Sequence, residues 1–163
     1  MSTDYDSLEP ELLTFSSQFD SGNLRNCLVK EDTPGRHEFN LYISGDSTPY
    51  EKAHYKTWFY FSIKGMPRDS IITFSIRNMG NQGKLIKNGL RPVYRSLSSQ
   101  KWKRVHGTVK YKNEKGYSTL SWEHEFDEME ANDVFYFAYT YPYSYTETLT
   151  KTAKVIARVQ KAN

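Results

Sequence analysis

Residues 133–145 read DVFYFAYTYPYSY, and more than half of them are aromatic. Because successive side chains of a strand point to opposite faces, this stretch would carry bulky or apolar side chains on both faces. One face holds Phe135, Phe137, Tyr139 and Tyr141, and the other holds Tyr136, Ala138 and Thr140. We therefore predict a central strand that is covered on both sides and ends at Pro142, which cannot donate to a sheet.

A helix is predicted directly after this strand. Ser144 and Glu147 have the spacing of a capping box, in which each side chain accepts a hydrogen bond from the other residue's backbone. Apolar residues then recur on one helical face, at Leu149, Ala153, Ile156 and Val159. Cations gather toward the end, where the helix dipole favours them. The helix should cover about residues 145–161.

The rest of the chain alternates apolar and polar residues in short segments separated by turn clusters. Strands are predicted over residues 11–19, 23–31, 36–44, 55–64, 70–78, 92–97, 108–112 and 118–126, in addition to the aromatic stretch. Residues 80–89 read as a loop and residues 98–106 as a polar connection. About nine short strands followed by one C-terminal helix predict an all-β fold, an antiparallel β-sandwich.

The chain has 163 residues, which is enough for one domain with a sizeable core. Aromatic residues make up 15% of it, which favours an all-β domain over a helical bundle. We expect a flexible N-terminus at 1–10, the sandwich at 11–143 and the helix at 144–163.

The net charge of +3 hides an uneven distribution, because residues 84–115 carry ten lysines and arginines against only Glu114. Such a basic block can attract an acidic partner. The candidates for this role are Lys84, Lys87, Arg91, Arg95, Lys101, Lys103 and Arg104. The alternative is a solvated surface whose charge is balanced by the six acids of residues 117–133.

The sequence gives no sign of an active site or a metal site. The four histidines, His37, His54, His106 and His124, have no zinc-ligand spacing, and we expect His37 and His124 to be core or sheet-face residues. Cys27 has no evident histidine partner and is interpreted as a buried small residue. Residues 80–84 read GNQGK without the spacing of a phosphate loop, so a hairpin loop is expected.

The polar, acidic start of the chain lacks the apolar segment of a signal peptide. No apolar run approaches the roughly 20 residues that a membrane-spanning helix needs. A single cysteine is typical of a reducing compartment. We therefore predict a cytoplasmic protein without membrane contact.

Six phrases occur in an order and spacing typical of a known family. They are FSSQFDSGNL at 15–24, WFYF at 58–61, IRN at 76–78, NGLRP at 88–92, FYFAY at 135–139 and YPYSY at 141–145. Together they resemble the N-terminal domain of the cytosolic carboxypeptidases, zinc metallocarboxypeptidases that remove glutamates from tubulin tails. The resemblance covers about residues 13–150.

The resemblance implies an antiparallel β-sandwich that precedes a catalytic domain and packs against it. In this family the zinc ligands and catalytic residues belong to that second domain, so no catalytic residue and no cofactor is assigned to this chain. The implied function is that of a non-catalytic accessory domain, with a catalytic domain in cis or in trans and acidic tubulin tails as partners. The chain would be a fragment of a longer enzyme or a separately encoded domain.

Two binding sites are hypothesised. Tyr141, Pro142, Tyr143 and Tyr145 could form a docking surface, because aromatic side chains with a polar tip suit an interface. The alternative is that they are core. The seven candidates of the basic block could attract an acidic substrate tail.

Two other function classes compete with the accessory domain. The first is a stand-alone β-sandwich module that binds protein or carbohydrate, for which the only outward aromatic residues are Trp58, Tyr60 and Tyr42. The second is nucleic-acid binding through the basic block, which ranks last because that block has few aromatic residues.

Overall fold

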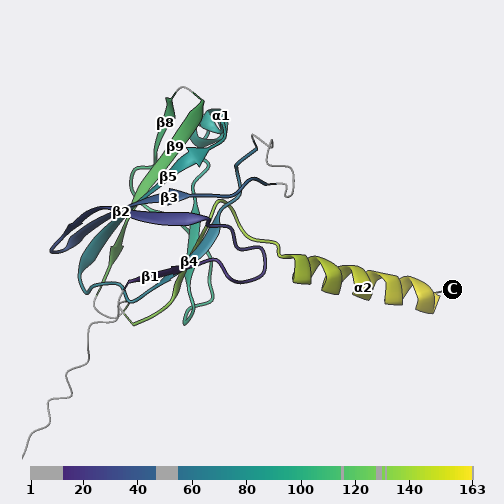
Figure 1. The fold of residues 1–163 in the computed structure, drawn as a ribbon. Coiled ribbons are helices and arrows are strands. Elements are labelled where there is room, and N and C mark those ends of the chain that lie inside the picture. The colour runs from purple at the N-terminus through teal and green to yellow at the C-terminus, as the bar shows by residue number, and fades with distance from the viewer. Residues whose placement is uncertain (1–12, 47–54, 115, 128–129, 131, 163) are drawn as a thin grey trace, which may run out of the picture.

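The computed structural model describes residues 13–46, 55–114, 116–127, 130 and 132–162. These residues form a sandwich of two five-stranded sheets, and helix α2 leads away from it (Figure 1). The predicted β-sandwich with a C-terminal helix is therefore confirmed. The N-terminal residues 1–10, predicted to be flexible, lie outside the described part of the chain.

The first sheet contains the aromatic stretch at its centre. Its strands, in spatial order, are β1 (Thr14–Ser16), β4 (Tyr60–Lys64), β10 (Phe135–Ala138), β6 (Val93–Ser96) and β7 (Lys103–Arg104). All its pairs are antiparallel, and Phe137 of β10 lies opposite Phe61 on one side and Tyr94 on the other. The central position predicted for the aromatic strand is confirmed.

The second sheet contains one parallel pair. Its strands, in spatial order, are β2 (Asn26–Thr33), β3 (Arg36–Tyr42), β5 (Ser70–Met79), β9 (Tyr117–Phe126) and β8 (Lys110–Glu114). The pair β3–β5 is parallel, with Phe39 opposite Phe74, and the other pairs are antiparallel. This one pair departs from the antiparallel pairing of the predicted sandwich, because the chain crosses to the other sheet to form β4 before it returns as β5.

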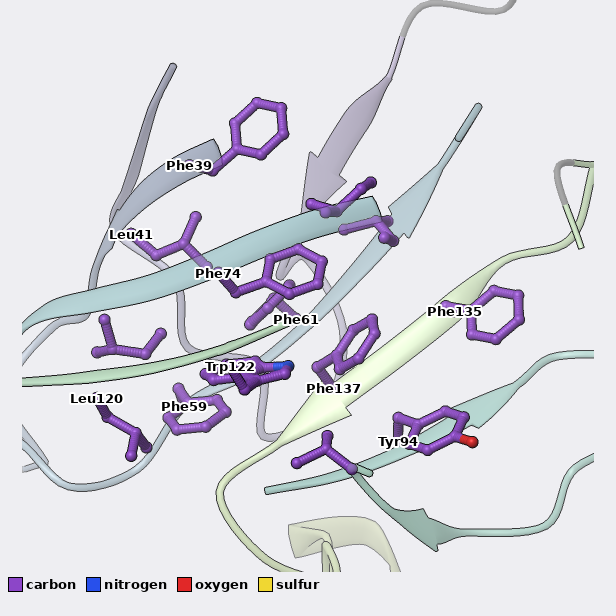
Figure 2. Close-up of a cluster of buried hydrophobic side chains, with 14 of the residues drawn as sticks. Phe39, Leu41, Phe59, Phe61, Phe74, Tyr94, Leu120, Trp122, Phe135 and Phe137 are labelled. Atoms are coloured by element: carbon purple, nitrogen blue, oxygen red, sulfur yellow. The ribbon is translucent and has the colours of Figure 1, made fainter. Parts of the chain in front are cut away.

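Aromatic rings from both sheets make the core (Figure 2). The Phe74 ring centroid lies 4.9 Å from that of Phe137 and 5.8 Å from that of Phe61, and Phe59 stacks on Trp122 at 5.6 Å. These separations are the ones that aromatic pairs prefer. Alternate residues of β9 are buried as predicted, namely Ser118, Leu120, Trp122, His124 and Phe126.

The outer face of β10 is covered as well. Ala138 is buried there with Tyr60 and Val93, and the partly buried rings of Phe19, Trp58, Trp102 and Tyr136 pack against this group. The prediction that both faces of the central strand are covered is confirmed. Tyr60 is therefore no outward aromatic residue, since only 7% of its surface is exposed.

The predicted strand limits differ from the observed ones. The strand expected from residue 55 begins only at Tyr60, because the Asp46 carboxylate accepts the backbone N–H groups of Thr57 and Trp58 that a neighbouring strand would use. The strand expected at 11–19 is only β1, and β10 ends at Ala138, before Pro142. Hydrogen bonding by the Asp46 side chain thus accounts for the late start of β4.

Two elements lie in segments predicted to be irregular. The loop at 80–89 contains the short helix α1 (Gly83–Lys87), where Ile86 packs against the core. The connection at 98–106 contains β7, which brings the strands among the described residues to ten, against the predicted number of about nine. Both depend on contacts with distant residues, so a local pattern could not predict them.

Helix α2 (Tyr145–Ala162) begins as predicted. The Ser144 N–H donates to Glu147 Oε2 over 3.0 Å, and the Glu147 N–H donates to Ser144 Oγ over 3.2 Å, which is a capping box. The helix projects from the sandwich (Figure 1), and Leu149, Ile156 and Val159 are each more than half exposed. Neither helix among the described residues is long and apolar enough to cross a membrane.

Candidate functional site

The segment between β10 and α2 presents aromatic side chains at the surface. We call Tyr141, Pro142, Tyr143 and Tyr145 the aromatic corner. The three tyrosines are 51%, 55% and 66% exposed, respectively, and Pro142 is half-buried. The tyrosine side chains of the aromatic corner are therefore not core residues, although they continue the same run of sequence as β10.

A turn near the N-terminus holds the aromatic corner and the start of α2. The Thr146 N–H donates to Asp20 Oδ2 over 2.9 Å, and the Tyr145 N–H donates to Ser21 Oγ over 3.3 Å. The hydrogen bond from the Thr146 backbone is the main reason that the pKa of Asp20 falls to about 2. Asp20 thus remains charged at neutral pH, beside the positive end of the helix dipole.

The same turn is hydrogen-bonded to the segment that leads into β4. The Asn23 side chain donates to the carbonyl oxygens of Ser44 and Trp58 and accepts the Ser44 N–H. Trp58 Nε1 donates to the Ser21 carbonyl oxygen over 2.7 Å. A Cβ atom at Gly22 would lie 2.1 Å from the Ser17 carbonyl oxygen, so only glycine fits this turn. These contacts fix the surface beside the aromatic corner.

Between this turn and the aromatic corner lies a surface hollow of about 670 Å³, which we call the aromatic hollow. It is lined by Ser21, Gly22, Asn23, Ser44, Gly45, Asp46, Trp58, Tyr141 and Tyr143. Trp58, predicted to point outward, is half-buried and contributes one wall. Asp46 was not predicted as a site residue, because no local sequence pattern shows that an acid in a polar loop lies beside aromatic rings.

A second hollow of about 420 Å³ adjoins the aromatic corner at Pro142 and contains Arg95. The Arg95 guanidinium lies 4.6 Å from the ring centroid of Tyr136 and 5.3 Å from that of Trp102, and it donates to Gln100 Oε1 over 2.6 Å. These ring contacts are cation–π interactions within the domain. Arg95 therefore has a structural role in covering the first sheet.

The other six predicted basic residues lie in three places. Lys84 and Lys87 lie on α1, which contacts β8 at the edge of the second sheet. Lys101, Lys103 and Arg104 are exposed in or near β7, the edge of the first sheet, whereas Arg91 donates to the Gly107 carbonyl oxygen. Among the described residues, none of the seven forms an ion pair with an acid. No ion pair therefore joins the block to the acids of 117–133 in this part of the chain, although Lys103 is close enough to Glu130 to interact with its charge.

The histidines and the cysteine that were considered for metal binding or catalysis make contacts typical of structural residues. His124 is buried against the rings of Tyr94 and Phe126, as predicted, and burial is the main cause that lowers its pKa to about 4. His37 is half-buried and lies 2.6 Å from Asp32, and burial raises the pKa of the Cys27 thiol to about 11. His54 lies outside the described residues. Within the part of the chain that the structure describes, no three metal-ligand side chains gather.

Fold and surface together define a two-sheet β-sandwich that presents a helix and an aromatic corner at one end. The chain belongs to the cytosolic carboxypeptidase family: the family model described as "Cytosolic carboxypeptidase N-terminal domain" matches residues 15–140. This range begins within β1 and ends just after β10, so it contains nearly the whole sandwich.

Similar proteins agree with this assignment. Cytosolic carboxypeptidase-like protein 5 of Rattus norvegicus is 32% identical over 151 residues, which cover 78% of this chain and 18% of the rat protein. Cytosolic carboxypeptidase 1 of Xenopus laevis is 31% identical over 80% of this chain and 12% of its own length. The chain thus spans less than a fifth of the length of these relatives.

Among solved structures, a metallo-carboxypeptidase from Burkholderia cenocepacia matches 88% of this chain and 33% of its own, with a TM-score of 0.59. One from Pseudomonas aeruginosa matches the same share of this chain with a TM-score of 0.53. At 23% and 22% identity, these matches support the fold alone.

Proposed function

We propose that this domain is a non-catalytic accessory module that docks against a carboxypeptidase catalytic domain, in cis or in trans. The exposed aromatic corner is the observation that carries this proposal. Exposed tyrosines are enriched at protein interfaces, because each combines a large apolar ring with a polar tip. The apolar face of α2 lies next to this corner and adds Leu149, Ile156 and Val159 to the surface that a partner could cover.

The relatives support this docking role. Each extends far beyond the matched region, and neighbouring domains of one chain commonly share an interface. The family's name places its members in the cytosol, and we propose the same compartment here. On this proposal the catalytic partner, and not this domain, would supply zinc chemistry for the deglutamylation of proteins such as tubulin.

Docking can be tested with this chain and a separately expressed carboxypeptidase catalytic domain from a full-length relative, by calorimetry. The double substitution of Tyr143→Ala and Tyr145→Ala should weaken binding at least tenfold without unfolding the domain. The matched control is Tyr55→Ala with Tyr117→Ala, since these tyrosines are also exposed, at 77% and 59%, but lie outside the aromatic corner. Equal losses in both double variants, or none in either, would contradict the proposal.

We propose in addition that the exposed cations near β7 attract acidic tails of a substrate such as tubulin. Lys101, Lys103 and Arg104 are exposed and have no ion pair among the described residues. Attraction of this kind weakens with salt, because the Debye length is about 8–10 Å near physiological ionic strength.

The test of this second role is calorimetry with a glutamate-rich, tubulin-like peptide at low and at physiological salt. Replacement of Lys101, Lys103 and Arg104 by alanine should remove the salt-sensitive part of binding. Alanine at Lys110 and Lys112, which are exposed on β8 of the other sheet, provides the control. Binding that does not respond to salt would exclude electrostatic recruitment.

A further inference from the structure

The aromatic hollow combines one carboxylate with three aromatic rings. Among the described residues that line it, Asp46 is the single carboxylic acid, Trp58, Tyr141 and Tyr143 are the rings, and there is no lysine, arginine or histidine. A positive charge is attracted both to a carboxylate and to the face of an aromatic ring. The lining is therefore complementary to a cationic side chain.

The Asp46 carboxylate is held in place but keeps capacity for a further donor. Oδ1 accepts the N–H groups of Thr57 and Trp58, and Oδ2 accepts, from the described part of the chain, only that of Thr57, at 3.0 Å. A carboxylate oxygen has two lone pairs, so Oδ2 can accept another hydrogen bond. No cation among the described residues forms an ion pair with Asp46. Its charge is fixed and not neutralised there.

The domain already uses its tyrosines to bind cations. Lys151 of α2 places its Nζ atom 4.3 Å from the ring centroid of Tyr143, and Arg95 lies against Tyr136 in the neighbouring hollow. Lys151 is not among the residues that line the aromatic hollow. The ring of Tyr143 thus attracts an ammonium group of the domain itself, while the described residues that line the aromatic hollow include no cation.

We infer that the aromatic hollow receives an arginine or lysine side chain of the docking partner, which pairs with Asp46 and packs on Tyr141 and Tyr143. This inference rests on the docking function proposed above and specifies the chemistry of the partner surface. An arginine fits best, because its planar guanidinium can stack on a ring and still donate to a carboxylate.

The hollow can be tested on this chain alone, by NMR titration with acetyl-arginine amide. The Trp58 indole signal should shift, while those of Trp102 and Trp122 serve as internal references outside the hollow. Acetyl-glutamate amide should leave Trp58 unchanged.

Asp46→Asn, whose side-chain oxygen can still accept a backbone N–H, should reduce arginine affinity at least threefold. Lys151→Gln should raise it, because a competing cation is removed from Tyr143. An unmoved Trp58 signal, or equal shifts with both amides, would overturn the inference.

The docking assay separates failure of this inference from failure of the proposed function. We expect Asp46→Asn to weaken binding of the catalytic domain at least threefold at low salt and less at high salt. If the substitutions of Tyr143 and Tyr145 abolish docking while Asp46→Asn has no effect, docking stands and the cationic contact does not. If neither alters binding, docking through the aromatic corner is itself wrong.

Discussion

Residues 135–139 and 141–145 have nearly the same aromatic composition but opposite surroundings. Phe135, Phe137 and Tyr139 are buried in the core, whereas Tyr141, Tyr143 and Tyr145 are more than half exposed. The difference arises because β10 lies between β4 and β6, while the next residues leave the sheet and enter α2. An aromatic run is therefore a core in one place and a candidate binding surface a few residues later.

The largest expected effect comes from replacing one aromatic side chain in each half of this run by alanine. Phe137→Ala removes a ring that contacts both sheets and should lower the free energy of unfolding by about 3–5 kcal/mol. Tyr143→Ala should change it by no more than about 0.5 kcal/mol, as is usual for exposed positions. Urea denaturation of both variants measures the contrast. Similar losses would mean that the two halves do not differ as described.

A somewhat smaller effect is expected from pH, through the buried half. The pKa of His124 falls from 6.5 to about 4 on folding, mainly because burial disfavours its charged form. Between these two pH values the unfolded state binds more protons than the folded state, so protonation of His124 favours unfolding. The contribution of neutral His124 to stability is therefore complete above pH 6.5 and is lost as the pH falls toward 4. The loss should approach about 3 kcal/mol.

Urea denaturation between about pH 7 and pH 4 checks this dependence. His124→Phe, which places an uncharged ring among the same neighbours, should flatten it. His106→Gln should retain most of the dependence, because His106 is exposed and is only the lesser cause of the shift. A profile that His124→Phe leaves unchanged would assign the pH dependence to other groups.

A substitution in the exposed half should change the stability of α2 and leave that of the sandwich nearly unchanged. Ser144→Ala removes one side of the capping box and should destabilise α2 by about 1 kcal/mol. All described side chains of α2 are exposed, so the sandwich should unfold at nearly the same urea concentration as before. Amide hydrogen exchange within α2 measures the local effect, and Thr152→Ala serves as the control on the same helix. A large shift of the global midpoint would indicate that α2 stabilises the sandwich.

The smallest effect is expected at the hydrogen bond that joins the turn at Asp20 to the start of α2. Asp20→Asn should speed exchange of the Thr146 amide, because a charged acceptor is replaced by a neutral one. The pKa of Asp20 is lowered to about 2, so its contribution is present above pH 3.8 and disappears as the pH falls toward 2. The difference between wild type and variant should therefore be larger at about pH 6 than at about pH 3. Asp69→Asn, in an exposed turn, is the matched control.

Periodicity predicted much of this fold because each signal depends on neighbouring residues. Alternation placed Leu120, Trp122 and Phe126 on the buried face of β9, and the spacing of Ser144 and Glu147 located the start of α2. Strand ends were less accurate where a distant side chain intervened, as Asp46 does before β4. The candidate site was predicted only in part: the sequence indicated the aromatic corner, but it did not indicate Asp46.

Residue patterns along the chain were enough to predict the all-β class, the capped helix, the aromatic centre of the sheet and the resemblance to cytosolic carboxypeptidase N-terminal domains. These features depend on local spacing and on phrases kept in order along the chain. Three arrangements became known from the folded chain alone: β3 and β5 run parallel, Arg95 packs between Trp102 and Tyr136, and Asp46 lines the same hollow as Trp58 and Tyr143. The reason is that these arrangements join residues distant in the chain, and no period of two or of 3.6 residues records such contacts.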